Sequence, residues 1–179
     1  MDSGAQEQTT APVDPEDRLR ACVAIESWVA GMLAGRPYAD TDAVLARGRD
    51  LAAAWTDAEV EEALAGHPRI GERTTSAHST REQSGVGSDA DTAARLADGN
   101  RRYEERFGRI YLVRAAGRDA EEMLALLEQR LGHDDETERR VVREQLAEIT
   151  LLRLTDAAED LVDGSVEGPV DGGAGRVGS

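Results

Sequence analysis

Apolar side chains recur every three or four residues through the middle of this 179-residue chain, and that spacing constrains the fold more than any other feature. Residues spaced in this way share one face of an α-helix, whereas a half-buried strand alternates apolar and polar positions. No stretch shows sustained alternation of that second kind. The pattern therefore predicts an all-α fold, a single compact domain of roughly seven or eight helices.

Breaks in this pattern give the bounds of the expected helices. The expected segments are 15–33, 41–55, 56–66, 89–107, 119–131 and 136–161, with a helix start or sharp turn at 79–83. Thr56 and Glu59 fit a capping box. The face expected to be buried in segment 89–107 carries Ala93, Leu96, Ala97, Tyr103 and Phe107. The short apolar run 110–113 fits either a buried extended connector or a helix start.

The two ends of the chain differ from its middle in composition. Residues 1–14 are small and polar, and residues 162–179 are rich in glycine and contain no aromatic residue. Such segments bury too little apolar surface to offset the entropy lost on ordering. We expect disordered tails at 1–14 and 162–179, on either side of one helical domain at 15–161.

Charge and composition exclude several classes of function. The chain has 36 acidic and 21 basic residues, and its formal net charge of −15 disfavours binding to nucleic acids or anionic membranes. All of the basic residues are arginine, so the chain offers no lysine for a Schiff base, a pyridoxal-phosphate anchor or a usual phosphate-binding loop. It shows neither a signal-peptide pattern nor an apolar run of transmembrane length, which favours a cytoplasmic location.

Cysteine and histidine placement gives little sign of a metal site. Cys22 is the only cysteine, and its apolar helical surroundings favour a small buried side chain over a nucleophile. His67, His78 and His133 do not fall at ligand spacings on one helical face. Residues 133–136 are typical of a solvated turn and N-cap. We therefore expect no bound metal.

His67 is the first candidate for chemistry. It lies between Gly66, an expected helix stop, and Pro68, and a residue before proline is pushed out of the helical region. The imidazole should therefore project from a loop, where its ordinary pKa of about 6.5 suits proton transfer. The alternative is that Gly-His-Pro only ends a helix and the histidine is incidental.

A second candidate is the segment that contains Ser79, Glu82 and Gln83. Serine followed three residues later by glutamate is typical of a capping box, which is the structural explanation. A functional role needs Glu82 to face a cavity, and Gln83 could then offer a donor and an acceptor to a ring amide.

Arg153 is the most informative single residue. It falls four residues after Ile149, on the apolar stripe of the last expected helix. A guanidinium in that position must reach solvent or meet an anion. That anion could be a buried carboxylate of the protein or the carboxylate of a substrate, and the sequence does not decide between them.

Several short motifs follow one another in an order that resembles the OHCU decarboxylase family, whose substrate is 2-oxo-4-hydroxy-4-carboxy-5-ureidoimidazoline. The motifs are Trp28-Val29-Ala30, Arg36-Pro37-Tyr38, His67-Pro68-Arg69-Ile70-Gly71, Ser79-x-x-Glu82-Gln83, Asn100-x-x-Tyr103-x-x-x-Phe107-Gly108, Arg130-Leu131 and Ile149-x-x-Leu152-Arg153-Leu154. Each motif alone is short, but their shared order is specific. The resemblance extends roughly from Trp28 to Arg153.

The resemblance implies an all-helical, usually dimeric enzyme that decarboxylates its substrate without a cofactor and yields (S)-allantoin in uric acid degradation. It implies that His67 is the catalytic acid/base, that Glu82 orients His67 or the substrate, and that Arg153 holds a substrate carboxylate or ring oxygen. The pocket would be lined by Pro68, Ser79, Gln83, Leu112, Val113, Arg114 and Ala115. Functional coupling to urate oxidase and hydroxyisourate hydrolase is a further expectation.

This chain departs from the family pattern at three places. His-Pro-Asp-Leu of many members is His67-Pro68-Arg69-Ile70 here, and Phe-Gly-Phe-Pro-Phe corresponds to residues 107–111, which carry Arg109. His133 stands where an asparagine commonly follows the Arg-Leu pair. The departures affect the pocket wall near 109–115 more than the three principal residues.

Two other functions compete with this interpretation. The first is a non-catalytic helical module that scaffolds purine-degrading enzymes, which would not need its candidate residues to share one pocket. The second is a metal hydrolase on His67, His78 and His133, which their spacing disfavours.

Overall fold

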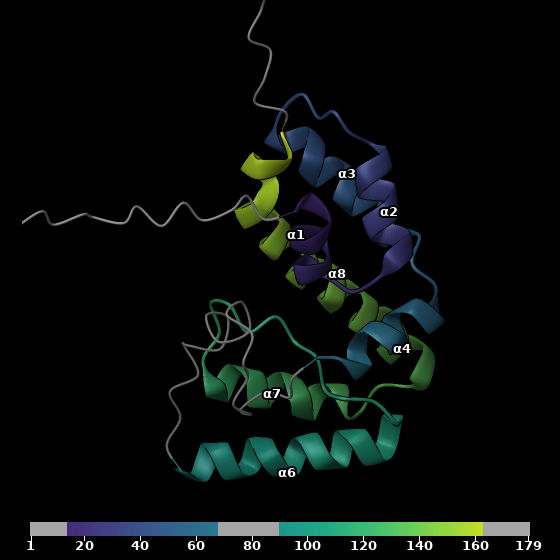
Figure 1. The fold of residues 1–179 in the computed structure, drawn as a ribbon. Coiled ribbons are helices and arrows are strands. Elements are labelled where there is room, and N and C mark those ends of the chain that lie inside the picture. Colours follow the sequence, from purple (N-terminus) through teal and green to yellow (C-terminus); the bar gives the residue numbers. More distant parts are fainter. Residues whose placement is uncertain (1–13, 68–89, 163–179) are drawn as a thin grey trace, which may run out of the picture.

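The computed structural model describes residues 14–67 and 90–162, and its described residues form seven helices. The helices are α1 (Pro15–Cys22), α2 (Glu26–Ala34), α3 (Thr41–Ala53), α4 (Asp57–Ala65), α6 (Ala90–Phe107), α7 (Ala120–Arg130) and α8 (Asp135–Leu161) (Figure 1). The described part contains no β-strand, only an isolated bridge between Tyr38 and Val162. The all-α prediction is confirmed. None of the described helices has the length and apolar character needed to cross a membrane.

The helix expected at 15–33 is two helices, and the prediction of one was wrong. α1 ends at Cys22 because Val23 has extended backbone angles, and Ile25 is extended as well before α2 begins. Both side chains are buried. The apolar spacing therefore continues across the break, so periodicity could not reveal it. The break lets α1 pack on α8 while α2 packs on α3.

Polar caps start the helices where the sequence predicts them. Thr56 and Glu59 form the capping box of α4, and Asp119 and Glu122 form a second one on α7. α8 begins after Asp134, whose side chain accepts a hydrogen bond from the Thr137 amide. These contacts satisfy amide groups that have no partner within their own helix.

Asp14 and Val162, at the inner ends of the two expected tails, belong to the described fold. The Asp14 side chain caps α1, and Val162 pairs with Tyr38 in the isolated bridge. The remainder of the two expected tails, 1–13 and 163–179, lies outside the described residues.

The long helix α8 is the centre of the larger hydrophobic cluster. α3, α1 and α4 all pack against it, and α8 passes behind α1 and extends toward α4 in Figure 1. Trp28 on α2 is buried and donates its indole N–H to the Gly48 carbonyl at 2.9 Å. A Cβ atom at Gly48 would lie 2.5 Å from a Leu154 methyl group, so this glycine permits the close approach of α3 to α8.

α6 and α7 form a second hydrophobic cluster, and they lie side by side at the other end of the molecule (Figure 1). The prediction for the buried face of α6 was partly wrong, because Ala93 and Ala97 are exposed. The buried positions are Thr92, Leu96, Gly99, Asn100, Tyr103 and Phe107. Alanine is small and occurs at both buried and exposed positions, so the spacing of alanines did not show which face of α6 is buried.

The segment 110–115 lies between the two hydrophobic clusters and is not helical. Ile110 and Leu112 pack in the cluster around α8, whereas Tyr111, Val113 and Ala115 pack in the cluster of α6 and α7. Alternation of this kind is typical of an extended chain. Of the two interpretations that the sequence left open, the structure supports the buried connector.

Candidate active site

His67 lies two residues beyond the end of α4, as the sequence predicts. Its amide donates to the Leu64 carbonyl at 3.0 Å, and Nδ1 of its ring lies 3.0 Å from the Ala63 carbonyl oxygen. A carbonyl oxygen can only accept, so this contact places the proton of a neutral imidazole on Nδ1. Nε2 is then the nitrogen with the lone pair, which can take up and release a proton.

A cavity of about 470 Å³ lies beside the half-buried His67. It is bounded by the end of α4, the end of α6 and the start of the connector. The residues that line it are Glu61, Leu64, Ala65, His67, Glu104, Phe107, Gly108, Arg109 and Ile110. The segment after α6 therefore shares a cavity with the candidate acid/base.

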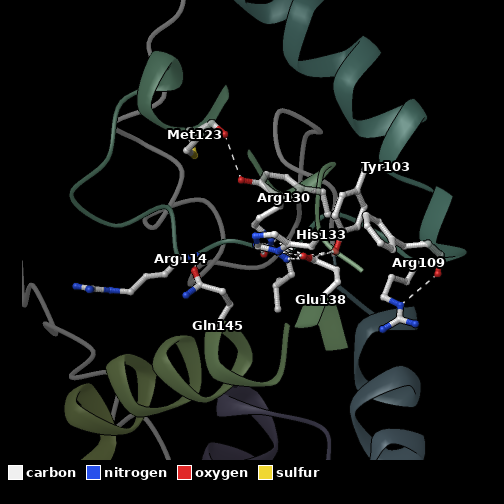
Figure 2. A network of polar contacts seen from close by, with 11 residues as sticks. Tyr103, Arg109, Arg114, Met123, Arg130, His133, Glu138 and Gln145 are labelled. Carbon is white, nitrogen blue, oxygen red and sulfur yellow. Dashed lines mark hydrogen bonds and ion pairs between the residues drawn. The ribbon is translucent and has the colours of Figure 1, made fainter. Parts of the chain in front are cut away.

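Arg109 is a lining residue to which sequence reasoning gave no role. Gly108 has a φ of +68°, a value that suits glycine, and it ends α6 as predicted. The chain then turns so that the Arg109 side chain, 11% exposed, reaches Glu61, with Nη2 3.5 Å from Oε1. Arg109 Nε also donates to the Phe107 carbonyl at 3.3 Å (Figure 2). The departure from the family pattern at position 109 could have been the signal.

Arg153 lies on α8 and is buried, so its guanidinium does not extend into solvent, which was one of the two outcomes that the sequence left open. Its Nη1 donates to the Cys22 carbonyl at 3.2 Å, so the guanidinium is anchored to the free C-terminal end of α1. This contact with a backbone carbonyl is one that sequence reasoning did not consider. Arg153 is not one of the described residues that line the cavity beside His67.

Cys22 is buried, and the prediction that it is a small core residue is confirmed. Its Sγ lies 3.3 Å from the Arg18 carbonyl oxygen, to which the thiol donates. Burial raises the pKa of the Cys22 thiol to about 11, so the thiol is protonated at neutral pH. A protonated buried thiol is a poor nucleophile.

The expected pocket wall at 112–115 is held in place by side chains from two helices. Leu112, Val113 and Ala115 are buried, and Arg114 is half-buried. Arg130 on α7 donates from Nη1 to the Leu112 carbonyl at 2.6 Å. Gln145 on α8 accepts a hydrogen bond at Oε1 from the Arg114 amide, at 3.0 Å.

A buried network of polar side chains surrounds Arg130 (Figure 2). Its Nε donates to Glu138 Oε1 at 2.9 Å, Glu138 is fully buried, and Tyr103 donates its hydroxyl to the same carboxylate. The Arg130 guanidinium also lies 4.8 Å from the ring centre of Tyr111. The buried negative charge is thus paired with a cation and a hydroxyl, as a buried carboxylate requires.

Burial also changes how these tyrosines titrate. It raises the pKa of Tyr111 to about 12 and also raises the pKa of Tyr103, although the nearby Arg130 guanidinium opposes both shifts. Both hydroxyls are therefore protonated donors over the physiological pH range, which suits the bonds from Tyr103 to Glu138 and from Tyr111 to the Met123 carbonyl.

Glu138 and Gln145 were missed by sequence reasoning. Glu138 falls four residues before Val142 on the stripe that drew attention to Arg153, so the same signal could have found it. The turn predicted at 133–136 is confirmed in the cap at Asp134. The predicted exposure of His133 was only partly right, since Nδ1 of its half-buried ring lies 2.8 Å from Glu138 Oε2.

The other candidate residues lie outside the described part of the chain. They are Pro68, His78, Ser79, Glu82 and Gln83. Their roles, and a meeting of Glu82 with His67 and Arg153, stay predictions. Within residues 14–67 and 90–162, no group of three or more His, Cys, Asp or Glu side chains could hold a metal ion.

The sequence of this chain is similar to a known protein family and to one of its members. A model of the OHCU decarboxylase family matches residues 9–155. The 2-oxo-4-hydroxy-4-carboxy-5-ureidoimidazoline decarboxylase of Amia calva is 32% identical over 135 residues, which cover 71% of this chain and 77% of that protein.

Two solved structures share the fold. An OHCU decarboxylase crystallised in the presence of (S)-allantoin is similar with a TM-score of 0.70 and 24% identity, over 80% of this chain and 99% of that one. An (S)-allantoin synthase is similar with a TM-score of 0.58 and 16% identity, over 84% of this chain and 55% of that one.

Proposed function

The chain belongs to the OHCU decarboxylase family, and we infer from that membership that it decarboxylates 2-oxo-4-hydroxy-4-carboxy-5-ureidoimidazoline to allantoin in urate degradation. The observation that carries this conclusion is the family match over residues 9–155, most of the chain. We propose further that the product is the (S) enantiomer and that the protein needs no cofactor.

The chemistry of the substrate supports a reaction without a cofactor. Loss of carbon dioxide leaves an electron pair on the ring, and a neighbouring imine or carbonyl of the substrate can accept it. The substrate is then its own electron sink, which suits a chain without lysine. The protein has to hold the anion, set the carboxylate out of the ring plane and direct one proton to one face.

His67 is the proposed catalytic acid/base. The contact of Nδ1 with the Ala63 carbonyl orients the ring and puts the lone pair of a neutral imidazole on Nε2, the atom proposed to transfer the proton. The cavity beside the ring supports this role, because the reacting carbon must come within hydrogen-bond reach of the proton donor. Glu82 is proposed to orient His67 or the substrate, as the family resemblance implies.

Arg153 is proposed to hold the substrate carboxylate or a ring oxygen. A guanidinium carries five N–H groups in a planar arrangement, and the bond from Nη1 to the Cys22 carbonyl fixes that plane. Its burial supports a strong interaction with an anion, because water screens the charge less there. Pro68, Ser79, Gln83 and the segment Leu112–Ala115 are proposed to line the rest of the pocket.

The family resemblance supports further proposals about the whole protein. We propose one helical domain at 15–161 with tails at 1–14 and 162–179, a homodimer, and a cytoplasmic location. The substrate is unstable, so an enzyme that consumes it should work close to the enzymes that produce it. We therefore also propose functional coupling to urate oxidase and hydroxyisourate hydrolase.

A coupled assay tests the function. Urate oxidase and hydroxyisourate hydrolase generate the substrate in the cuvette, and circular dichroism then follows optically active allantoin with and without the protein. We expect the signal to grow faster with the protein and to have the sign of the (S) enantiomer. Racemic product formed at the rate of the protein-free reaction would instead favour the non-catalytic helical module.

A further inference from the structure

The backbone of segment 110–115 depends on side chains for its hydrogen bonds. The segment lies between two hydrophobic clusters and does not pair with a strand in the described part of the chain. Buried amide and carbonyl groups need partners, because an unpaired one costs free energy comparable to a lost hydrogen bond. Side chains on α7 and α8 supply two of these partners, Arg130 to the Leu112 carbonyl and Gln145 to the Arg114 amide.

The two side chains differ in what else they do. Arg130 is 4% exposed and shares Glu138 with Tyr103, so its loss would leave a buried carboxylate without its cation. Gln145 is half-buried, and within residues 14–67 and 90–162 its side chain bonds to the Arg114 amide and takes no part in the network around Arg130. Gln145 can therefore be changed without breaking the buried network.

The connector reaches the cavity beside His67 at its first residue, and residues 111–115 are not among the described residues that line this cavity. Ile110 begins the segment and lines the same cavity as His67, and Arg114 lies four residues further along the connector. Figure 2 shows the Gln145 amide next to the Arg114 backbone, with the Arg114 guanidinium directed away from it. Gln145 thus acts on the backbone of the connector, and α8 provides a rigid base for that contact.

We propose that Gln145 is a positioning residue that fixes the backbone of Arg114 and thereby the wall against which the substrate ring lies. This inference rests on the proposed function, in which residues 112–115 line the substrate pocket. A wall that shifts by about 1 Å can cost on the order of a hundredfold in rate, because the reacting atoms lose their alignment. It would also let the proton reach either face of the ring.

Two substitutions at Gln145 distinguish the effect of losing the hydrogen-bond acceptor from the effect of changing the size of the side chain. Gln145→Met keeps the chain length, but a thioether is only a weak acceptor. Gln145→Glu keeps an oxygen that accepts from the Arg114 amide. Gln129→Leu on the exposed face of α7 is the matched control, because it also replaces a helical glutamine with an apolar residue.

We expect Gln145→Met to lower kcat by roughly tenfold or more and to reduce the enantiomeric excess of allantoin. KM should change less, because the charged groups that hold the anion are intact. Gln145→Glu should keep the wild-type enantiomeric excess, and Gln129→Leu should match the wild type in every measurement. Hydrogen exchange at the Arg114 amide should accelerate in Gln145→Met alone.

Wild-type kcat, enantiomeric excess and Arg114 exchange in Gln145→Met would overturn the inference. So would a folded Gln145→Glu variant that loses enantiomeric excess as Gln145→Met does, because the acceptor would then not be the cause. The exchange measurement does not depend on activity. A wild-type protein without activity would therefore count against the proposed function, whereas unchanged exchange in Gln145→Met would count against the positioning role.

Discussion

Cys22 and Arg153 show how single buried polar groups set the properties of this protein. The Cys22 carbonyl accepts a hydrogen bond from Arg153, while its thiol lies in the core as a protonated group. The sequence predicted the burial of Cys22 from its apolar surroundings, whereas for Arg153 it left open whether the guanidinium reaches solvent or meets an anion. It could not predict the bond between them, because that bond depends on the end of α1 at Cys22, which the periodicity did not reveal.

Stability at high pH should depend on Cys22. Burial raises the pKa of the folded thiol from 9.0 to about 11, so the unfolded chain loses this proton first as the pH rises. The free energy of unfolding should therefore fall between pH 9 and pH 11, by up to about 2 kcal/mol from this group. Urea unfolding across that range should show the fall in the wild type and a smaller one in Cys22→Ala. Equal slopes in both proteins would contradict the assigned burial.

Helices α6, α7 and α8 are joined through the polar network around Arg130. Arg130 is the last residue of α7, Tyr103 lies on α6, and Glu138 lies in the first turns of α8. Periodic spacing predicted these helices, because each has an apolar face. It did not predict how they meet, because Arg130 and Glu138 are charged residues, which would ordinarily be assigned to the surface.

Removal of the Glu138 charge should weaken the polar network that joins α6, α7 and α8. Gln keeps the shape of the side chain but leaves the Arg130 guanidinium buried without its anion, so we expect Glu138→Gln to lower the free energy of unfolding by about 3 kcal/mol. Glu144→Gln, in an exposed ion pair with Arg140 on the same helix, should change it by less than about 1 kcal/mol. Urea denaturation of both variants is the measurement. A loss in Glu138→Gln no larger than in Glu144→Gln would show that the buried pair adds little stability.

At the scale of the whole molecule, the connector 110–115 separates two hydrophobic clusters and borders the cavity beside His67. The sequence predicted the fold class, most helix bounds and the place of His67 at a helix end. It gave no role to Gln145, whose partner Arg114 lies 31 residues away and leaves no local pattern, or to Glu138, although the place of Glu138 on the apolar stripe was a usable signal. The order of the short motifs indicated the family, because these motifs are spread along most of the chain, roughly from Trp28 to Arg153.

The central claim is that His67 transfers the proton in the decarboxylation, and His67→Asn tests it most directly. The asparagine amide can still donate to the Ala63 carbonyl, as Nδ1 does now, but it lacks the titrating nitrogen at Nε2. Equal thermal unfolding of the variant and the wild type is the control for folding. We expect the variant to lose at least about a hundredfold of the protein-dependent rate in the coupled circular-dichroism assay and to yield nearly racemic allantoin. A variant that forms (S)-allantoin at the wild-type rate would contradict the account.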